Sequence, residues 1–273
     1  PNAVNKLDYK LNELIDLSKL VKLSKDVEYE LRIPIQTNSP YVGEGAFAHN
    51  GGIHVDAVLK GASYNHINPE IVGNKSKIVL SNNSGAATIC SIVEEQTGIS
   101  VSKKDKRVGE MLTEVKNMLD RGYNIGILSA EHYLLASKFF GNYDEIFQVK
   151  DWMINTMKGK DSICKIWGTI DGKETAALED VLGGPVDAAY KSIKTMIEDP
   201  VLDKVHLVNY FVEITRVGSR EEASTVNVYI TFRNGDSEWT TVGNNPNILE
   251  ASVEAISKGF RYYLLKQREQ KKS

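Results

Sequence analysis

The sequence predicts an α+β protein, in which small helical linker subdomains are followed by a domain of two strand-strand-helix repeats. Apolar residues recur with helical spacing in the first half, and strand-like runs begin near residue 146. One pattern of turn, glycines, proline and helix also occurs twice, about 60 residues apart. These observations divide the 273 residues into segments 1–75, 76–145 and 146–273.

Four segments of the first half have the apolar spacing of amphipathic helices. They are residues 6–24, 84–98, 105–121 and 129–140. The first is expected to end before an extended stretch between Pro34 and Pro40, and Gly98 stops the second. A short helix is expected to begin at His54, and Asn68-Pro69 predicts a turn.

The second half alternates between strand-like runs and two helices. The runs are residues 163–170, 205–216, 224–233 and 238–242. In each repeat a turn, Asp171-Gly172 or Asn234-Gly235, leads to a Gly-rich stretch and to a proline that opens a helix, Pro185 or Pro246. Each unit is therefore expected to be a hairpin followed by a helix, and two such units can bury a shared sheet face.

Composition and charge argue against several classes of protein. The net charge of −3 and the lack of a basic, aromatic stripe argue against nucleic-acid binding. We expect no membrane span and no signal peptide, because no long apolar run and no basic start occur. The missing initiator Met suggests a chain cut from something longer. Cys90 and Cys164 are far apart in apolar settings, which predicts buried, inert thiols and a cytoplasmic location.

The most unusual segment runs from His49 to His54 and contains two glycines. Two histidines five residues apart can ligate a metal, although no carboxylate or thiol completes a ligand set. A tight turn with surface histidines is a second interpretation. The third is general acid–base chemistry at His54, with Tyr64 as a hydroxyl partner. The other histidines and the clustered tyrosines are expected to be structural: His66, His132, His206, Tyr190, Tyr210, Tyr229, Tyr262 and Tyr263.

Both ends of the chain resemble one known family. Residues 43–60 and 64–74 match, in register, the segment that follows the catalytic barrel in the 2-isopropylmalate synthase and citramalate synthase family. Residues 239–243 and 247–252 resemble the regulatory, LeuA dimerisation-type domain of the longer bacterial and archaeal citramalate synthases, and residues 184–188 resemble its first repeat. The resemblance covers essentially the whole chain and favours the citramalate synthases.

The resemblance implies a division of labour in catalysis. The family's barrel, which is absent here, holds the 2-oxo acid and a divalent metal (zinc, manganese or magnesium), so this segment is expected to bind no cofactor. His54 matches the catalytic histidine that helps to generate or position the acetyl-CoA enolate, and Tyr64 matches a tyrosine of the same site. Some relatives carry an asparagine two residues before this tyrosine, where this chain has Ala62.

The resemblance also implies a homodimer whose last domain binds the end-product amino acid. The implied reaction condenses acetyl-CoA with pyruvate to citramalate and CoA, the first step of the pyruvate route to isoleucine, and isoleucine is the expected effector. Backbone N–H groups at the two helix starts are expected to hold its carboxylate, although simple helix capping is the alternative. The residues concerned are Gly184, Val186, Asp187, Gly243 and Asn245.

Two other assignments stay open at this point. One is the C-terminal part of a 2-isopropylmalate synthase, in leucine biosynthesis. The other is a stand-alone amino-acid-binding and dimerisation module without catalysis. The choice of 2-oxo acid belongs to the absent barrel, and the chain by itself is expected to be inactive.

Overall fold

In the computed structural model, the described residues are 15–31, 33–50, 65, 67–141, 146–216, 223–235 and 237–272. The chain divides into two compact units, residues 1–89 and 90–273, and helix α4 (Ala86–Thr97) runs through the division. Helices and small sheets both occur, which confirms the α+β class. The predicted boundaries at 75/76 and 145/146 stay predictions.

The first unit consists of short elements around a small apolar cluster. These are the 3-10 turns η1 (Leu17–Lys19) and η2 (Pro69–Val72), helix α2 (Leu20–Leu31), and strands β1 (Ala48–Asn50) and β2 (Lys77–Val79). The two strands pair in parallel, with Ala48 opposite Lys77. Phe47, Ile67 and Val72 form the buried cluster. The predicted turn at Asn68-Pro69 is confirmed, because the Asn68 side chain caps η2.

Helix α2 extends beyond the predicted end at residue 24. It continues to Leu31, three residues before Pro34, because residues 25–31 contain good helix formers and no glycine or proline. The proline remains the feature that limits the helix. Residues 1–14, which contain the start of the predicted segment, lie outside the described residues.

The three helices predicted between residues 84 and 140 are confirmed within two residues at each end. They are α4 (Ala86–Thr97), α5 (Lys106–Asp120) and α6 (Ser129–Phe140). The Asp105 side chain accepts a hydrogen bond from Arg107 N at 2.9 Å and so caps α5. Gly98 follows α4 with a φ of 72°, the left-handed conformation in which glycine commonly ends a helix.

The repeat is confirmed, but each copy has three strands instead of the two of the expected hairpin. The runs at 205–216, 224–233 and 238–242 are confirmed as the three strands of the second copy, whereas residues 147–155 of the first copy form a strand that was not predicted. The first copy comprises β3 (Phe147–Asn155), β4 (Ser162–Ile170), β5 (Lys173–Val181) and α7 (Pro185–Ile197). The second comprises β6 (His206–Arg216), β7 (Thr225–Asn234), β8 (Ser237–Asn245) and α8 (Ile248–Lys272), and η4 (Pro200–Lys204) connects the two copies. Both sheets are antiparallel with the order of the sequence.

The second helix also begins later than predicted. Pro185 is the first residue of α7, as expected, but α8 starts at Ile248, two residues after Pro246. The Asn247 side chain accepts a hydrogen bond from Leu249 N at 2.9 Å, and Asn247 O accepts one from Ala251 N. Asn247 therefore caps α8, and Pro246 lies outside it.

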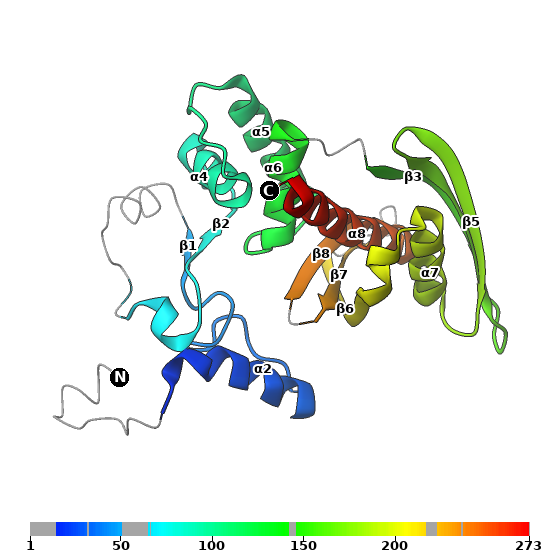
Figure 1. Ribbon diagram of the computed structural model, residues 1–273, viewed down its shortest axis with the longest axis horizontal. Helices are drawn as coiled ribbons and strands as arrows, with labels where there is room; N and C mark the ends of the chain where they lie inside the picture. Colours follow the sequence, from blue (N-terminus) through cyan, green and yellow to red (C-terminus); the bar gives the residue numbers. More distant parts are fainter. Residues whose placement is uncertain are drawn as a thin grey trace. The chain divides into compact units, whose positions relative to one another are not determined.

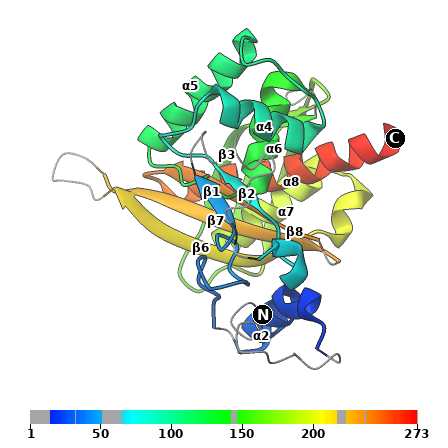
Figure 2. The same cartoon turned by 90° about the vertical axis from the view of Figure 1, so that its left-hand side faces the viewer.

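The two repeats share one core with α6. Helix α7 packs on the first sheet, α8 packs on β7 and β8, and the two helices pack against each other (Figure 1). Figure 2 shows β6, β7 and β8 as one twisted antiparallel ribbon. Aromatic rings dominate the middle of this core, where Phe232 is fully buried between Trp239 and Phe260 at centroid distances of 5.7 and 5.8 Å.

Two helical glycines give opposite predictions for the same substitution. Gly109, in α5, is exposed, and a Cβ there would meet no atom within 4 Å. Gly259, in α8, is buried, and its Cβ would lie 2.0 Å from Cε2 of Phe232. We expect Gly109→Ala to raise the free energy of unfolding by about 0.5–1 kcal/mol. Gly259→Ala should lower it by about 1–3 kcal/mol, because the packed ring must move. Denaturant unfolding of both variants measures this, and a stabilised Gly259→Ala would contradict the packing.

Candidate effector pocket

The predicted catalytic residues lie outside the described residues. Residues 51–64 include His54, Ala62 and Tyr64, so their roles stay predictions. His49 lies in β1 and is half-buried. His132 is buried in α6 with Nε2 3.1 Å from Ile125 O, which agrees with its predicted structural role.

Three of the five predicted effector residues line one cavity of the second unit. Gly184, Val186 and Asp187 border a cavity of about 470 Å³ at the start of α7. The start of β6 forms the other side. The remaining lining residues are Tyr190, His206, Leu207 and Tyr210. Tyr190, His206 and Tyr210 were expected to be structural, and Leu207 was expected only as part of a strand, since nothing in the sequence shows that the start of β6 returns to the start of α7.

The start of α7 provides hydrogen-bond donors without side-chain caps. Gly184 is the N-cap residue and makes no side-chain cap hydrogen bond, and Pro185 follows it. The N–H groups of a first helical turn have no acceptor within the helix and carry the positive end of its dipole. Asp187 adds a carboxylate beside them, which pairs with Lys191 at 2.9 Å on a half-exposed surface. The pocket therefore offers N–H donors for an anion and a carboxylate for a cation.

Two tyrosines fix the apolar part of the pocket. The Tyr190 hydroxyl donates to Val205 O at 2.5 Å, and burial, together with Asp187, raises its pKa to about 12. The Tyr210 hydroxyl shares a hydrogen bond of 3.0 Å with Ser252 Oγ. With both hydroxyls engaged, the rings and Leu207 present apolar surface. A small zwitterion with an aliphatic side chain fits this combination of groups.

The other two predicted effector residues do not reach this pocket. Gly243 lies in β8, and a Cβ there would be 1.9 Å from Ala251 O, so the backbone of α8 occupies the space. The Asn245 side chain accepts a hydrogen bond from Asn247 N at 2.8 Å in the turn before α8. Neither contact caps α8, because Asn247 does so; Gly243 allows close packing on α8, and Asn245 holds the turn before it.

A buried charge cluster joins α6 to the second repeat. Lys258 of α8 donates to Glu254 Oε1 at 2.8 Å and Val242 O at 2.7 Å, and its Nζ lies 3.3 Å from Oε2 of Glu131. Oε1 of Glu131 accepts a hydrogen bond from Val242 N at 2.8 Å. The side chains of Lys258 and Glu131 are only 12% and 2% exposed. Their charges are therefore matched by each other and by Glu254 instead of by water.

The pKa shifts of this cluster follow from its geometry. Burial alone would lower the pKa of Lys258, but Glu131, Glu254 and Tyr123 hold it well above its usual value. Burial raises the pKa of Glu131, while Lys258 and the N–H of Val242 oppose this rise. Because both oxygens of Glu131 face N–H donors, we regard the pair as ionised. No sequence pattern indicates this cluster, since Glu131 and Lys258 look like ordinary residues of two separate helices.

The two cysteines are sheltered to different extents. Cys164 is fully buried, as predicted, whereas Cys90 is only partly buried. Burial raises the pKa of both thiols, which disfavours the reactive thiolate. Across the described ranges, no three His, Cys, Asp or Glu side chains gather in a way that suits a metal ion. No helix in those ranges is long and apolar enough to cross a membrane.

Two domain families define the class of protein. Residues 127–264, half of the chain, match the LeuA allosteric (dimerisation) domain, and this region contains the whole pocket and the charge cluster around Lys258. Residues 41–123 match the homocitrate synthase post-HMGL domain-like family. The chain belongs to the family of 2-isopropylmalate and citramalate synthases that carry these two domains.

Similar proteins of known name indicate which members of this family the chain resembles. The chain is 32% identical to an (R)-citramalate synthase of Aquifex aeolicus over 99% of its length and 52% of the relative. It is 34% identical to the (R)-citramalate synthase of Sulfolobus acidocaldarius, over 97% of the chain and 50% of the relative. A 2-isopropylmalate synthase of Acetivibrio thermocellus is 28% identical over 89% of the chain and 47% of the relative. The chain thus spans about half the length of the relatives it matches.

Proposed function

We propose that this chain is the C-terminal part of an (R)-citramalate synthase, a cytoplasmic acyltransferase that condenses acetyl-CoA with pyruvate. The observation that carries the proposal is the match over nearly the whole chain to relatives of that name. The complete enzyme works as a homodimer, and its barrel supplies the 2-oxo acid site and a divalent metal. The chain by itself has no synthase activity.

Within this proposal, His54 and Tyr64 act on the acetyl-CoA. Removal of a proton from a thioester methyl group needs a base of moderate pKa and hydrogen-bond donors for the enolate oxygen. A neutral imidazole suits either role, and a phenol can donate to the oxygen of the adduct. The metal, when bound in the barrel, would polarise the keto carbonyl.

The pocket at the start of α7 is the proposed feedback site, with isoleucine as its effector. Its donors at the helix start suit the α-carboxylate, and Asp187 suits the α-ammonium group. Val186, Leu207 and the faces of two tyrosines suit a branched aliphatic side chain. Isoleucine is the end product of the pathway that the proposed reaction would begin.

A matched pair of variants in the complete enzyme tests this site. Asp187→Asn removes the carboxylate and should weaken inhibition by isoleucine about tenfold or more, because a charge-assisted hydrogen bond is lost. Lys191→Gln removes the ion-pair partner of Asp187 but keeps the carboxylate, so inhibition should persist. CoA release from acetyl-CoA and pyruvate, measured against isoleucine concentration, reports both. If isoleucine inhibits Asp187→Asn and the unchanged enzyme equally, this pocket is not the effector site.

The same assay separates the alternative assignments. Inhibition by leucine, with a branched 2-oxo acid preferred over pyruvate, would indicate a 2-isopropylmalate synthase like the Acetivibrio thermocellus relative. Amino-acid binding by a protein without any CoA release would indicate a binding module. Calorimetry of the 273-residue chain with isoleucine and leucine gives the binding result without the barrel.

A further inference from the structure

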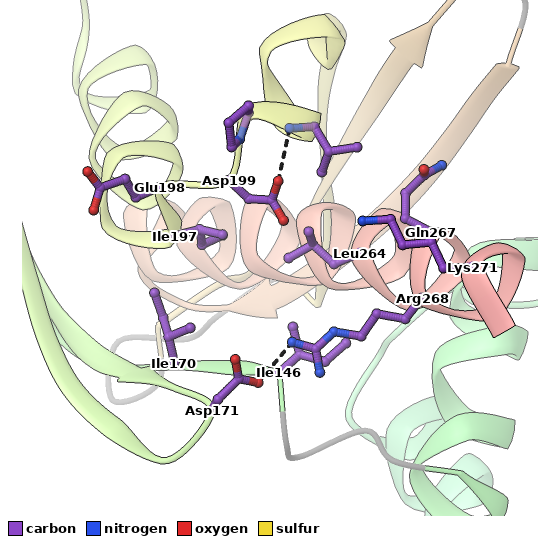
Figure 3. Close-up of a pocket in the computed structure, with 12 residues that line it drawn as sticks. Ile146, Ile170, Asp171, Ile197, Glu198, Asp199, Leu264, Gln267, Arg268 and Lys271 are labelled. Atoms are coloured by element: carbon purple, nitrogen blue, oxygen red, sulfur yellow. Dashed lines mark hydrogen bonds and ion pairs between the residues drawn. The ribbon is translucent and has the colours of Figure 1, made fainter.

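A second cavity lies at the opposite end of α7 and shares no lining residue with the effector pocket. It has a volume of about 270 Å³ and lies where the turn between β4 and β5, the end of α7 and the last turns of α8 converge (Figure 3). At about 30 Å³ per water molecule, this is room for roughly nine waters or a small organic molecule.

The floor of this cavity is aliphatic. Its side chains come from the residue before β3, from β4, α7 and η4, and from α8: Ile146, Ile170, Ile197, Val201 and Leu264. Ile146, Ile197 and Leu264 are 2%, 8% and 5% exposed, so the core holds them in place. An alkyl group of a ligand would contact a preformed apolar surface here.

Charged groups of both signs surround the floor. Arg268 donates from Nη2 to Asp171 Oδ1 at 2.8 Å, which leaves most of its five N–H donors for other acceptors. Lys271, on the same side of α8, extends over the cavity in Figure 3, and it forms no ion pair among the residues described. Asp199, the residue that caps the start of η4, faces Lys271 (Figure 3), and one of its oxygens accepts a hydrogen bond from Val201 N at 3.0 Å. Glu198 points away from the other lining side chains (Figure 3).

The two loops that carry the carboxylates have fixed conformations. Asp171 and Gly172 form the two-residue turn between β4 and β5, with φ values of 46° and 77°, as a tight hairpin turn requires. Glu198 ends α7 with a φ of 52°, a left-handed position that glycine usually fills. Pro200 follows at the start of η4. The walls of the cavity are therefore ordered without a ligand.

We propose that this cavity binds a short aliphatic carboxylic acid that carries a hydrogen-bond donor on its α carbon. Lys271 and the remaining donors of Arg268 hold the carboxylate, Asp199 accepts from the α substituent, and the alkyl chain covers the isoleucine floor. Both α-amino acids and 2-hydroxy acids have this chemistry. The site is independent of the proposed effector pocket, which uses backbone N–H groups instead of side-chain cations.

Isoleucine methyl groups provide a reporter for this cavity alone. Ile146, Ile170 and Ile197 line it, whereas the effector pocket contains no isoleucine. In the 273-residue chain with labelled isoleucine methyls, titration with L-valine and with 2-hydroxy-3-methylbutyrate at millimolar concentrations should shift these three signals. The stronger of the two titrations identifies the α substituent as ammonium or hydroxyl.

Substitutions of the charged lining residues test whether the two acids bind in this cavity. In the double variant Arg268→Gln, Lys271→Gln, the acid concentration that gives half-maximal shifts should rise about tenfold or more, because both cations that hold the carboxylate are gone. Lys116→Gln, which removes an exposed charge from α5, should leave them unchanged. Asp187→Asn should also leave them unchanged, which separates this site from the effector pocket. Unshifted isoleucine methyls with both acids, or equal binding by the double variant, would overturn the proposal.

Discussion

Replacing His54 by alanine in the complete enzyme is expected to lower turnover by about 10²–10⁴-fold, the usual contribution of a positioned acid or base. The methyl protons of a thioester are weakly acidic, and the enolate needs a donor near its oxygen as it forms. Alanine can neither accept the proton nor donate to the oxygen. Steady-state CoA release with acetyl-CoA and pyruvate measures the loss, and proton exchange at the acetyl methyl group shows whether enolisation is the affected step.

His49→Ala is the matched control, because the segment contains two histidines. If His54 acts in acid–base chemistry, His49→Ala should retain most of the turnover. If the two histidines ligate a metal together, both variants should lose activity equally, and added metal should partly restore it. Near-normal turnover of His54→Ala would leave only the turn interpretation of this segment.

Lys258→Met is expected to lower the free energy of unfolding by about 3–5 kcal/mol, the range seen when one partner of a buried ion pair is removed. Methionine keeps most of the volume of the lysine stem but leaves Glu131 nearly fully buried without its counter-charge. The hydrogen bond to Val242 O is lost as well. Denaturant unfolding at neutral pH measures the change.

The loss of unfolding free energy caused by Lys258→Met should depend on pH. Burial raises the pKa of Glu131, and without Lys258 nothing of opposite charge counters this rise. The folded variant then binds one more proton than the unfolded chain at pH values between the unfolded pKa, about 4.3, and the higher folded pKa. Its stability relative to the unchanged protein should therefore fall as pH rises through this window. We expect a smaller difference near pH 5 than near pH 8.

Lys266→Met provides the comparison on the same helix. Lys266 pairs with Glu269 at 3.4 Å, and its side chain is 32% exposed. Surface pairs of this kind contribute about 0–1 kcal/mol, so this variant should be only slightly destabilised at either pH. Equal effects of the two substitutions, or a difference that does not change with pH, would mean that the Lys258–Glu131 pair is not a buried ion pair in solution.

Periodicity predicted the helices better than the strands, for a physical reason. Residues 129–140 have a continuous apolar spacing and form α6 over the same range. Strand β5 was predicted only as the second arm of the hairpin at Asp171-Gly172 and not as a strand-like run, because in KETAALEDV only Ala177 and Val181 are buried and there is little apolar alternation. It forms because β4 offers it an unpaired edge after a two-residue turn. Such tertiary pairing is not encoded in local propensity.

Only the part of the candidate pocket that depends on a local sequence pattern could be predicted. The glycine and proline at the start of α7 indicated an open helix start, and three residues there do line a cavity. Repeat symmetry then suggested the same for Gly243, where the backbone of Ala251 fills the space. Tyr190 and Tyr210 could not be assigned to the pocket, because their position depends on the return of β6 to α7.

The Lys258–Glu131 contact also affects how this domain can be exchanged between enzymes. A recombination point at residue 145 would separate Glu131 from Lys258 and leave a buried ammonium without one of its two carboxylate partners. A point before residue 127 would transfer both together, and the match to the LeuA allosteric (dimerisation) domain begins there. Chimeras that graft the proposed feedback site onto a synthase should therefore include α6 with the two repeats.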